Sequence, residues 1–92
     1  MTEDQAQVLA LKALGWMGAQ DEILSGFLGA SGMDVDTLKQ SAGQSETLLA
    51  ILDYLLSQDT WVRDFCQDED VDPEAPMMAR AALPGGAEMH WT

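Results

Sequence analysis

Apolar residues recur along most of the chain at spacings of three and four positions, which is the periodicity of amphipathic helices. Over residues 3–17 the apolar side consists of Leu9, Ala13, Trp16 and Met17, widened by Leu11 and Leu14. No run of alternating β-branched residues occurs, and neither does an Asn-Gly or Asp-Gly turn. The pattern therefore predicts an all-α fold.

Capping residues and glycines divide this pattern into six predicted helices. Residues whose side chains can accept a hydrogen bond from a helix N-terminus precede five apolar segments, and they are Thr2, Asp21, Asp34, Ser45 and Asp59. Gln5 completes a capping box with Thr2. Asp72 followed by Pro73 is expected to begin the sixth helix. The predicted stop signals are Gly18, Gly32, Gly43, Pro84, Gly85 and Gly86.

The helix predicted for residues 46–57 is apolar almost all round. Its least apolar side carries Glu46, Ala50, Asp53 and Ser57. A helix of this kind belongs in the middle of a domain. We expect Asp53 to be exposed; burial would instead raise its pKa and make it a candidate acid–base group.

Two parts of the chain resemble one another at an offset of 38 residues. Val8–Asp36 and Glu46–Glu74 align without a gap, and the identical pairs are Leu11/Leu49, Leu14/Leu52, Gln20/Gln58, Asp21/Asp59, Phe27/Phe65 and Asp34/Asp72. Neither unit could bury its apolar faces alone. The alignment predicts two pseudo-symmetric halves of about 38 residues, with central helices at about 3–17 and 46–57. Repeated use of Asp caps and Leu faces in helical proteins is the alternative explanation.

Length and composition are typical of one small domain. The chain has 92 residues, of which 47% are hydrophobic. We expect a single helical domain over residues 1–84 and a flexible tail over residues 85–92, where periodicity is absent. A single cysteine excludes an internal disulfide, residues 48–56 are too short a run for a membrane span, and no signal peptide is recognisable. The cytoplasm is the expected location.

The chain is strongly acidic, with 16 Asp and Glu against four Lys and Arg and a formal net charge of −12. The four bases, which form no cluster in the sequence, are Lys12, Lys39, Arg63 and Arg80. Repulsion makes nucleic acids and anionic membranes poor partners. The charge can serve solubility alone, or it can attract a basic partner.

Three stretches carry a resemblance to a known family. They are ALKALGWMGAQDEILSGFLGASGMDVDTL, LLAILDYLLSQD and DVDPEAPMMARAALPGG, which together cover most of Ala10–Gly86. The chain resembles a small all-helical alphaproteobacterial family of unknown function. That resemblance implies a short bacterial cytoplasmic protein, and it supplies no activity, cofactor or site residue.

No metal or cofactor site is predicted. Asp68, Asp70 and Asp72 match the first, third and fifth positions of a calcium-binding EF-hand loop, but Pro73 and Ala79 stand where Gly and Glu are needed. Cys66 and His90 are too few for a zinc site or a Cys–His nucleophile, and Cys66 is expected in the core.

The glycines also lack a phosphate-loop signature, since no Gly-Lys-Ser or Gly-Lys-Thr follows them. We expect Gly26, Gly29 and Gly32, and likewise Gly15 and Gly18, to allow a neighbouring helix to approach closely.

The sequence predicts a non-enzymatic interaction protein, since it contains no catalytic set. The candidate surface is a groove between the two halves near Trp16, Ile23, Tyr54 and Trp61. Such a groove would accept an amphipathic helical segment with basic flanks. A homodimer through a leftover apolar face is a simpler version. The alternative is an acidic mimic of nucleic acid that acts on a basic protein, and a small enzyme would need two acids converging in a deep pocket.

Overall fold

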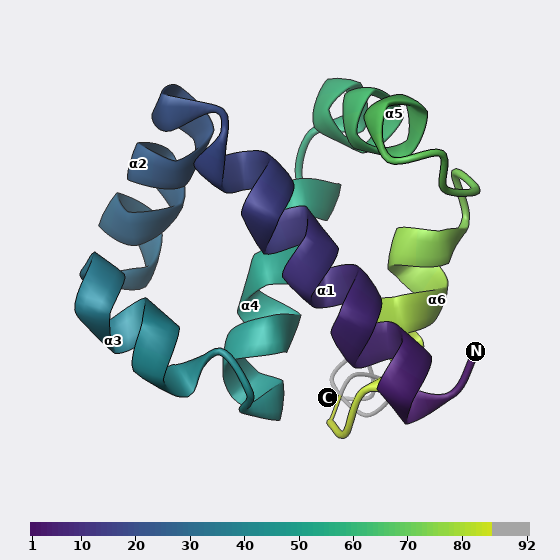
Figure 1. Ribbon diagram of the computed structural model, residues 1–92, viewed down its shortest axis with the longest axis horizontal. Helices are drawn as coiled ribbons and strands as arrows, with labels where there is room; N and C mark the ends of the chain where they lie inside the picture. Colours follow the sequence, from purple (N-terminus) through teal and green to yellow (C-terminus); the bar gives the residue numbers. More distant parts are fainter. Residues whose placement is uncertain (86–92) are drawn as a thin grey trace.

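Six helices form the fold in the part of the chain that the computed structural model describes, residues 1–85 (Figure 1). They are α1 (Glu3–Gly18), α2 (Asp21–Ser31), α3 (Val35–Ser41), α4 (Ser45–Leu56), α5 (Asp59–Asp68) and α6 (Ala75–Ala82). No strand occurs within these residues. The all-α, six-helix prediction is confirmed. The predicted tail, residues 85–92, lies outside the described residues except for Gly85.

The core lies between α1 and α4, which cross near the centre of the molecule (Figure 1). Helix α6 packs against both of them, α2 packs against both more lightly, and α5 packs against α4. On α1 the inward side is rich in alanine, and Ala6, Ala10 and Ala13 have no exposed surface. Small side chains at these positions let α4 and α6 approach the α1 backbone closely.

Helix α4 is buried on most of its circumference, as the apolar pattern predicts. Its buried residues are Thr47, Leu48, Leu49, Ile51, Leu52 and Leu55. Glu46, Asp53 and Ser57 are not buried and lie on the opposite side. Asp53 accepts a hydrogen bond from Arg80 of α6 and forms an ion pair with it. The exposed position of Asp53 is thus as predicted, and the pair links α4 to α6 at the surface.

Three of the predicted helix-end signals are confirmed. The capping box is present, because Thr2 Oγ1 accepts from the Gln5 backbone N–H at 3.1 Å and Gln5 Oε1 accepts from the Thr2 backbone N–H at 2.9 Å. Asp34 Oδ1 accepts from the Thr37 N–H at 2.7 Å, and this bond lowers the pKa of the Asp34 carboxyl. Gly32 follows α2 with φ of 75°, the left-handed conformation that glycine adopts without strain.

The other predicted N-caps were placed one residue too late. Gln20, Gln44 and Gln58 occupy the N-cap positions of α2, α4 and α5, and none of them makes a side-chain capping bond. Asp21, Ser45 and Asp59 are instead the first helical residues. A carboxylate in the first turn still stabilises a helix, because it faces the positive end of the helix dipole.

The predicted start of the sixth helix was also wrong. Helix α6 begins at Ala75, with Pro76 in its first turn, and not at Pro73. Asp70 has φ of 55°, so the chain turns sharply before α6. Pro76 therefore fills the N-terminal role that the sequence analysis gave to Pro73.

Close approach explains only one of the helix glycines. A Cβ atom at Gly26 would collide with the Tyr54 hydroxyl, so glycine is needed where α2 meets α4. A Cβ atom at Gly15, Gly18, Gly29 or Gly32 would meet nothing within 4 Å. The expectation of close packing was wrong at these four positions, which face open space.

The proposed pseudo-repeat stays a prediction. Helices α2 and α5 begin at Asp21 and Asp59, which matches the offset of 38 residues. The third helices of the two units pack differently, however. Helix α6 lies against both α1 and α4, whereas α3 contacts its neighbours only slightly and is anchored by the buried Leu38.

One expectation for α1 was wrong. Leu11, which the apolar pattern placed on the buried side, is 45% exposed.

Among residues 1–85, no helix combines the length and apolar character that crossing a membrane would require.

The two glycines of α2 provide a matched test of the packing. Gly26→Ala should lower the free energy of unfolding by about 1–2 kcal/mol, because the new methyl group displaces the Tyr54 ring. Gly29→Ala should raise it by up to about 1 kcal/mol, because alanine is the better helix former and meets no neighbour. Urea denaturation of both variants measures the difference. Equal effects would contradict the close contact between Gly26 and Tyr54.

Candidate functional site

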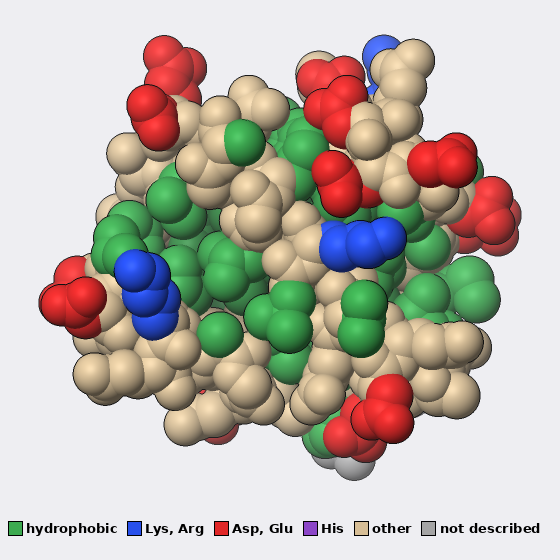
Figure 2. All heavy atoms as spheres, viewed as in Figure 1, with side chains coloured by type: hydrophobic (Ala, Val, Ile, Leu, Met, Phe, Trp, Pro, Cys, Tyr) green, Lys and Arg blue, Asp and Glu red, His purple; other side chains and the backbone are tan. Residues whose placement is uncertain are grey.

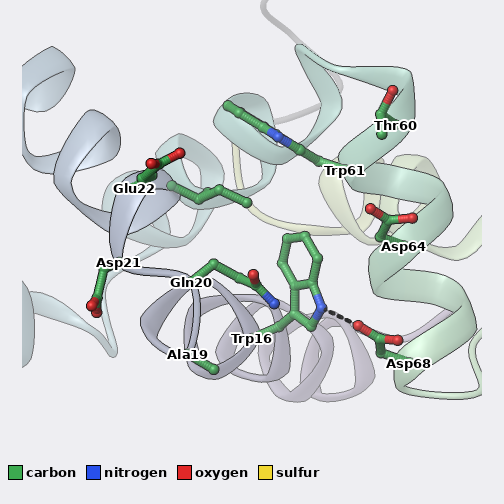
Figure 3. A pocket seen from close by; sticks show the side chains of 10 residues that line it. Trp16, Ala19, Gln20, Asp21, Glu22, Thr60, Trp61, Asp64 and Asp68 are labelled. Atoms are coloured by element: carbon green, nitrogen blue, oxygen red, sulfur yellow. Dashed lines mark hydrogen bonds between the residues drawn. The ribbon is translucent and has the colours of Figure 1, made fainter.

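A pocket of about 630 Å³ lies where the end of α1, the start of α2 and one side of α5 meet (Figure 3). Its large apolar lining residues are Trp16, Ile23 and Trp61. We call it the tryptophan pocket. These three residues and Tyr54 are the ones that the sequence analysis assigned to a groove, and three of the four line this single pocket.

Trp16 forms the base of the tryptophan pocket and is only 7% exposed. Its indole Nε1–H donates a hydrogen bond of 2.8 Å to Oδ2 of Asp68 on α5 (Figure 3). Its ring also meets Phe65 edge-on, with 5.9 Å between ring centroids and an interplanar angle of 73°. These two contacts attach the C-terminal end of α1 to α5.

Trp61 lies on the opposite side of the pocket and is half-buried. Its ring lies against Tyr54 of α4 at a centroid distance of 5.1 Å, and Tyr54 in turn meets Phe27 of α2 edge-on at 5.5 Å. Tyr54 is not among the residues that line the pocket, but its ring packs against the ring of Trp61. A row of three aromatic rings fixes the orientation of Trp61 relative to the core.

Acidic residues form two walls of the tryptophan pocket. Asp64 and Asp68 stand on α5, and Asp21 and Glu22 stand in the first turn of α2. Asp21 points away from the two tryptophans in Figure 3. No Lys or Arg occurs among the described residues that line the pocket. The lining carboxylates, with no base among the described lining residues, make the local potential negative.

The chemistry of this arrangement favours a cation. An ammonium or guanidinium group is attracted to the face of an indole ring, and carboxylates nearby add hydrogen bonds and charge. Among residues 1–85, no group of His, Cys, Asp and Glu side chains converges in a way that could hold a metal ion. The end of a Lys or Arg side chain is a cation of this kind, since it can contact an indole ring and a carboxylate together.

Cys66 lies outside the pocket and is buried in the core, as predicted. Its thiol donates a weak hydrogen bond of 3.5 Å to the Asp72 carbonyl oxygen. Burial, together with the negative charge of Asp72, raises the pKa of the Cys66 thiol. The neutral thiol is therefore favoured, and the nucleophilic thiolate is not.

The sequence analysis missed the acidic walls. Trp61, Asp64 and Asp68 follow one another at spacings of three and four, so they lie on one side of α5. This spacing could have been recognised in the sequence. The sequence analysis instead compared the three aspartates of residues 68–72 with a calcium-binding loop. The hydrogen bond between Trp16 and Asp68 joins residues that are 52 positions apart in the chain, and no local sequence pattern predicts it.

Removing the Asp68 carboxylate tests how α1 is attached to α5. Asp68→Ala leaves the buried Trp16 N–H without its acceptor, so the free energy of unfolding should fall by about 1–2 kcal/mol. Asp64→Ala is the matched control, since it removes a neighbouring exposed carboxylate and should change stability by less than about 0.5 kcal/mol. Urea denaturation distinguishes the two. An Asp68 variant as stable as the Asp64 variant would argue against the bond.

A family model described as a protein of unknown function (DUF3572) matches residues 3–86. No curated protein and no solved structure matches the chain.

Proposed function

The chain belongs to the DUF3572 family, for which no function is established, and we propose that it is a non-enzymatic interaction protein. It binds a basic helical segment of a partner protein in the tryptophan pocket. The observation that carries this proposal is the composition of the pocket: two tryptophans between walls of carboxylates, with no Lys or Arg among the described lining residues.

Trp61 supplies the surface on which a cationic side chain can rest. It is half-buried, and its orientation is fixed by Tyr54 at 5.1 Å. A cation over an indole ring contributes about 0.5–1 kcal/mol at an exposed site and about 2 kcal/mol when water is excluded. Because the ring is held in place before binding, little conformational entropy is lost there.

The carboxylates around the pocket favour arginine over a neutral side chain. Asp64 is exposed on α5 and Glu22 is exposed on α2, so the two walls can meet bases on both sides of a bound segment. Arg pairs with a carboxylate through two parallel hydrogen bonds, which adds orientation as well as affinity. The net charge of −12 also attracts a basic partner from a distance, with a rate that falls as salt is added.

A helical segment suits the dimensions of the site. A volume of about 630 Å³ accommodates one or two large side chains projecting from one face of a helix. The bases on the flanks of that face would reach Glu22 and Asp64. Mimicry of nucleic acid would instead need carboxylates in rows. In Figure 2 the acidic side chains stand as separate groups, mainly toward the edges of the face shown.

Titration calorimetry at low salt with an amphipathic helical peptide tests the proposal, with Leu on one face of the peptide and Arg on its flanks. We expect wild-type protein to bind this peptide and Trp61→Ala to bind it at least about tenfold more weakly, a loss of ~1.4 kcal/mol. A peptide with Glu in place of Arg should not bind.

Two charge variants sharpen this experiment. Asp64→Asn removes one carboxylate from the pocket, and Asp36→Asn removes an exposed carboxylate from α3, so the change in net charge is the same. Asp64→Asn should weaken binding severalfold more than Asp36→Asn. The proposal fails if the Arg peptide does not bind, or if it binds all variants equally.

A further inference from the structure

The outward side of α1 carries a stripe of exposed residues at spacings of three and four. We call it the α1 stripe, and its members are Asp4, Gln5, Val8, Leu11, Lys12 and Gly15. Val8 is 58% exposed and Leu11 is 45% exposed, and Met1, which precedes the helix, is 43% exposed. At about 100° per residue, the stripe spans about 60° on either side of Val8.

The surroundings of the α1 stripe are also apolar. Figure 2 shows hydrophobic side chains gathered over α1 and the helices beside it, with acidic groups mainly toward the edges. A shallow cavity of about 430 Å³ runs beside the stripe and is lined partly by Val71 and Ala75. An apolar helix face of this kind, next to an apolar depression, is typical of an interaction surface.

We propose that the α1 stripe is a homodimer interface, in which two copies of α1 pack antiparallel about a twofold axis beside Val8. The order of residues in the stripe supports a second copy as the occupant. In such a pair, position i lies level with position 16 − i of the other copy. Val8 then meets the partner's Val8, Asp4 lies level with the partner's Lys12, and Gln5 lies level with the partner's Leu11.

The charges of the α1 stripe complement one another only in the antiparallel arrangement. Asp4 and Lys12 are its two charged side chains, and both are exposed. The twofold axis brings each aspartate to a lysine of the other copy, so two ion pairs form. The two Asp4 carboxylates are separated by about 12 Å along the helix axis, at 1.5 Å rise per residue. A parallel pair would put like charges side by side.

The stripe is suited to self-association although the whole chain is strongly acidic. Its one acidic and one basic side chain balance, in contrast to the net charge of −12 for the chain. Gly15 has no side chain and has open space where a Cβ atom would lie, so it does not obstruct the partner's α1. The α1 stripe also excludes all residues of the tryptophan pocket. The dimer proposal therefore stands independently of the proposed function.

Charge exchange between two variants gives a sharp test. Asp4→Lys alone places its new ammonium group level with the partner's Lys12. Lys12→Glu alone places its new carboxylate level with the partner's Asp4. By sedimentation equilibrium, each variant should form homodimers at least tenfold more weakly than wild type. An equimolar mixture of the two variants should form a heterodimer at the concentrations where wild type dimerises, because both ion pairs are then restored. In one of these pairs the acid and the base have exchanged positions.

Matched controls separate this interface from general charge and folding effects. Glu3→Lys changes the same helix turn by the same charge but lies off the stripe, and Lys39→Glu reverses a lysine on α3. Both should dimerise as wild type does, and Val8→Asp should be monomeric alone and in every mixture. Circular dichroism checks that each variant is folded. A monomeric wild type, an unaltered Asp4 or Lys12 variant, or a mixture that stays monomeric would overturn the proposal.

Discussion

Burial of α4 is the constraint on which the rest of the structure depends. On α4, which is only twelve residues long, the buried side extends from Thr47 to Leu49 and covers more than half of the helix circumference. Leu48, Ile51, Leu52 and Leu55 lie in the middle of that side and have no exposed surface. Each of these side chains contributes about 1.5–3 kcal/mol only if it is removed from water on all sides. The other helices must therefore surround α4, which leaves only the side of Glu46, Asp53 and Ser57 in contact with solvent.

The tryptophan pocket follows from this arrangement. Helices α2 and α5 both pack against α4, and Tyr54 extends from α4 between Phe27 of α2 and Trp61 of α5. Gly26 makes room for the Tyr54 hydroxyl, so the distance between α2 and α4 is set by this contact. Trp16 then closes the base of the pocket through Asp68. The orientation of the pocket is thus fixed by the same packing that holds the core.

Sequence reasoning recovered what local physics determines. The six helices follow from periodicity, the burial of α4 from its nearly uniform apolar character, and the ends at Thr2, Gly32 and Asp34 from capping chemistry. It failed locally at four helix starts, where three N-caps were placed one residue too late and the sixth helix was begun at Pro73. It also failed where distant contacts decide. The exposure of Leu11 depends on which side of α1 meets α4 and α6, and the acceptor of the Trp16 N–H comes from 52 residues away. Three of the four aromatic and apolar residues assigned to a groove nevertheless line one pocket, because spacing along α1, α2 and α5 was sufficient to place them at adjoining helix ends.

Native-state amide hydrogen exchange of α4 tests the central claim most directly. If the fold depends on the enclosure of α4, the amides of Leu48–Leu55 should exchange only through global unfolding, with an opening free energy equal to that from urea denaturation. The amides of α3, which contacts its neighbours only slightly, should exchange through smaller openings. Exchange of α4 at a lower opening free energy than that of α3 would contradict the account.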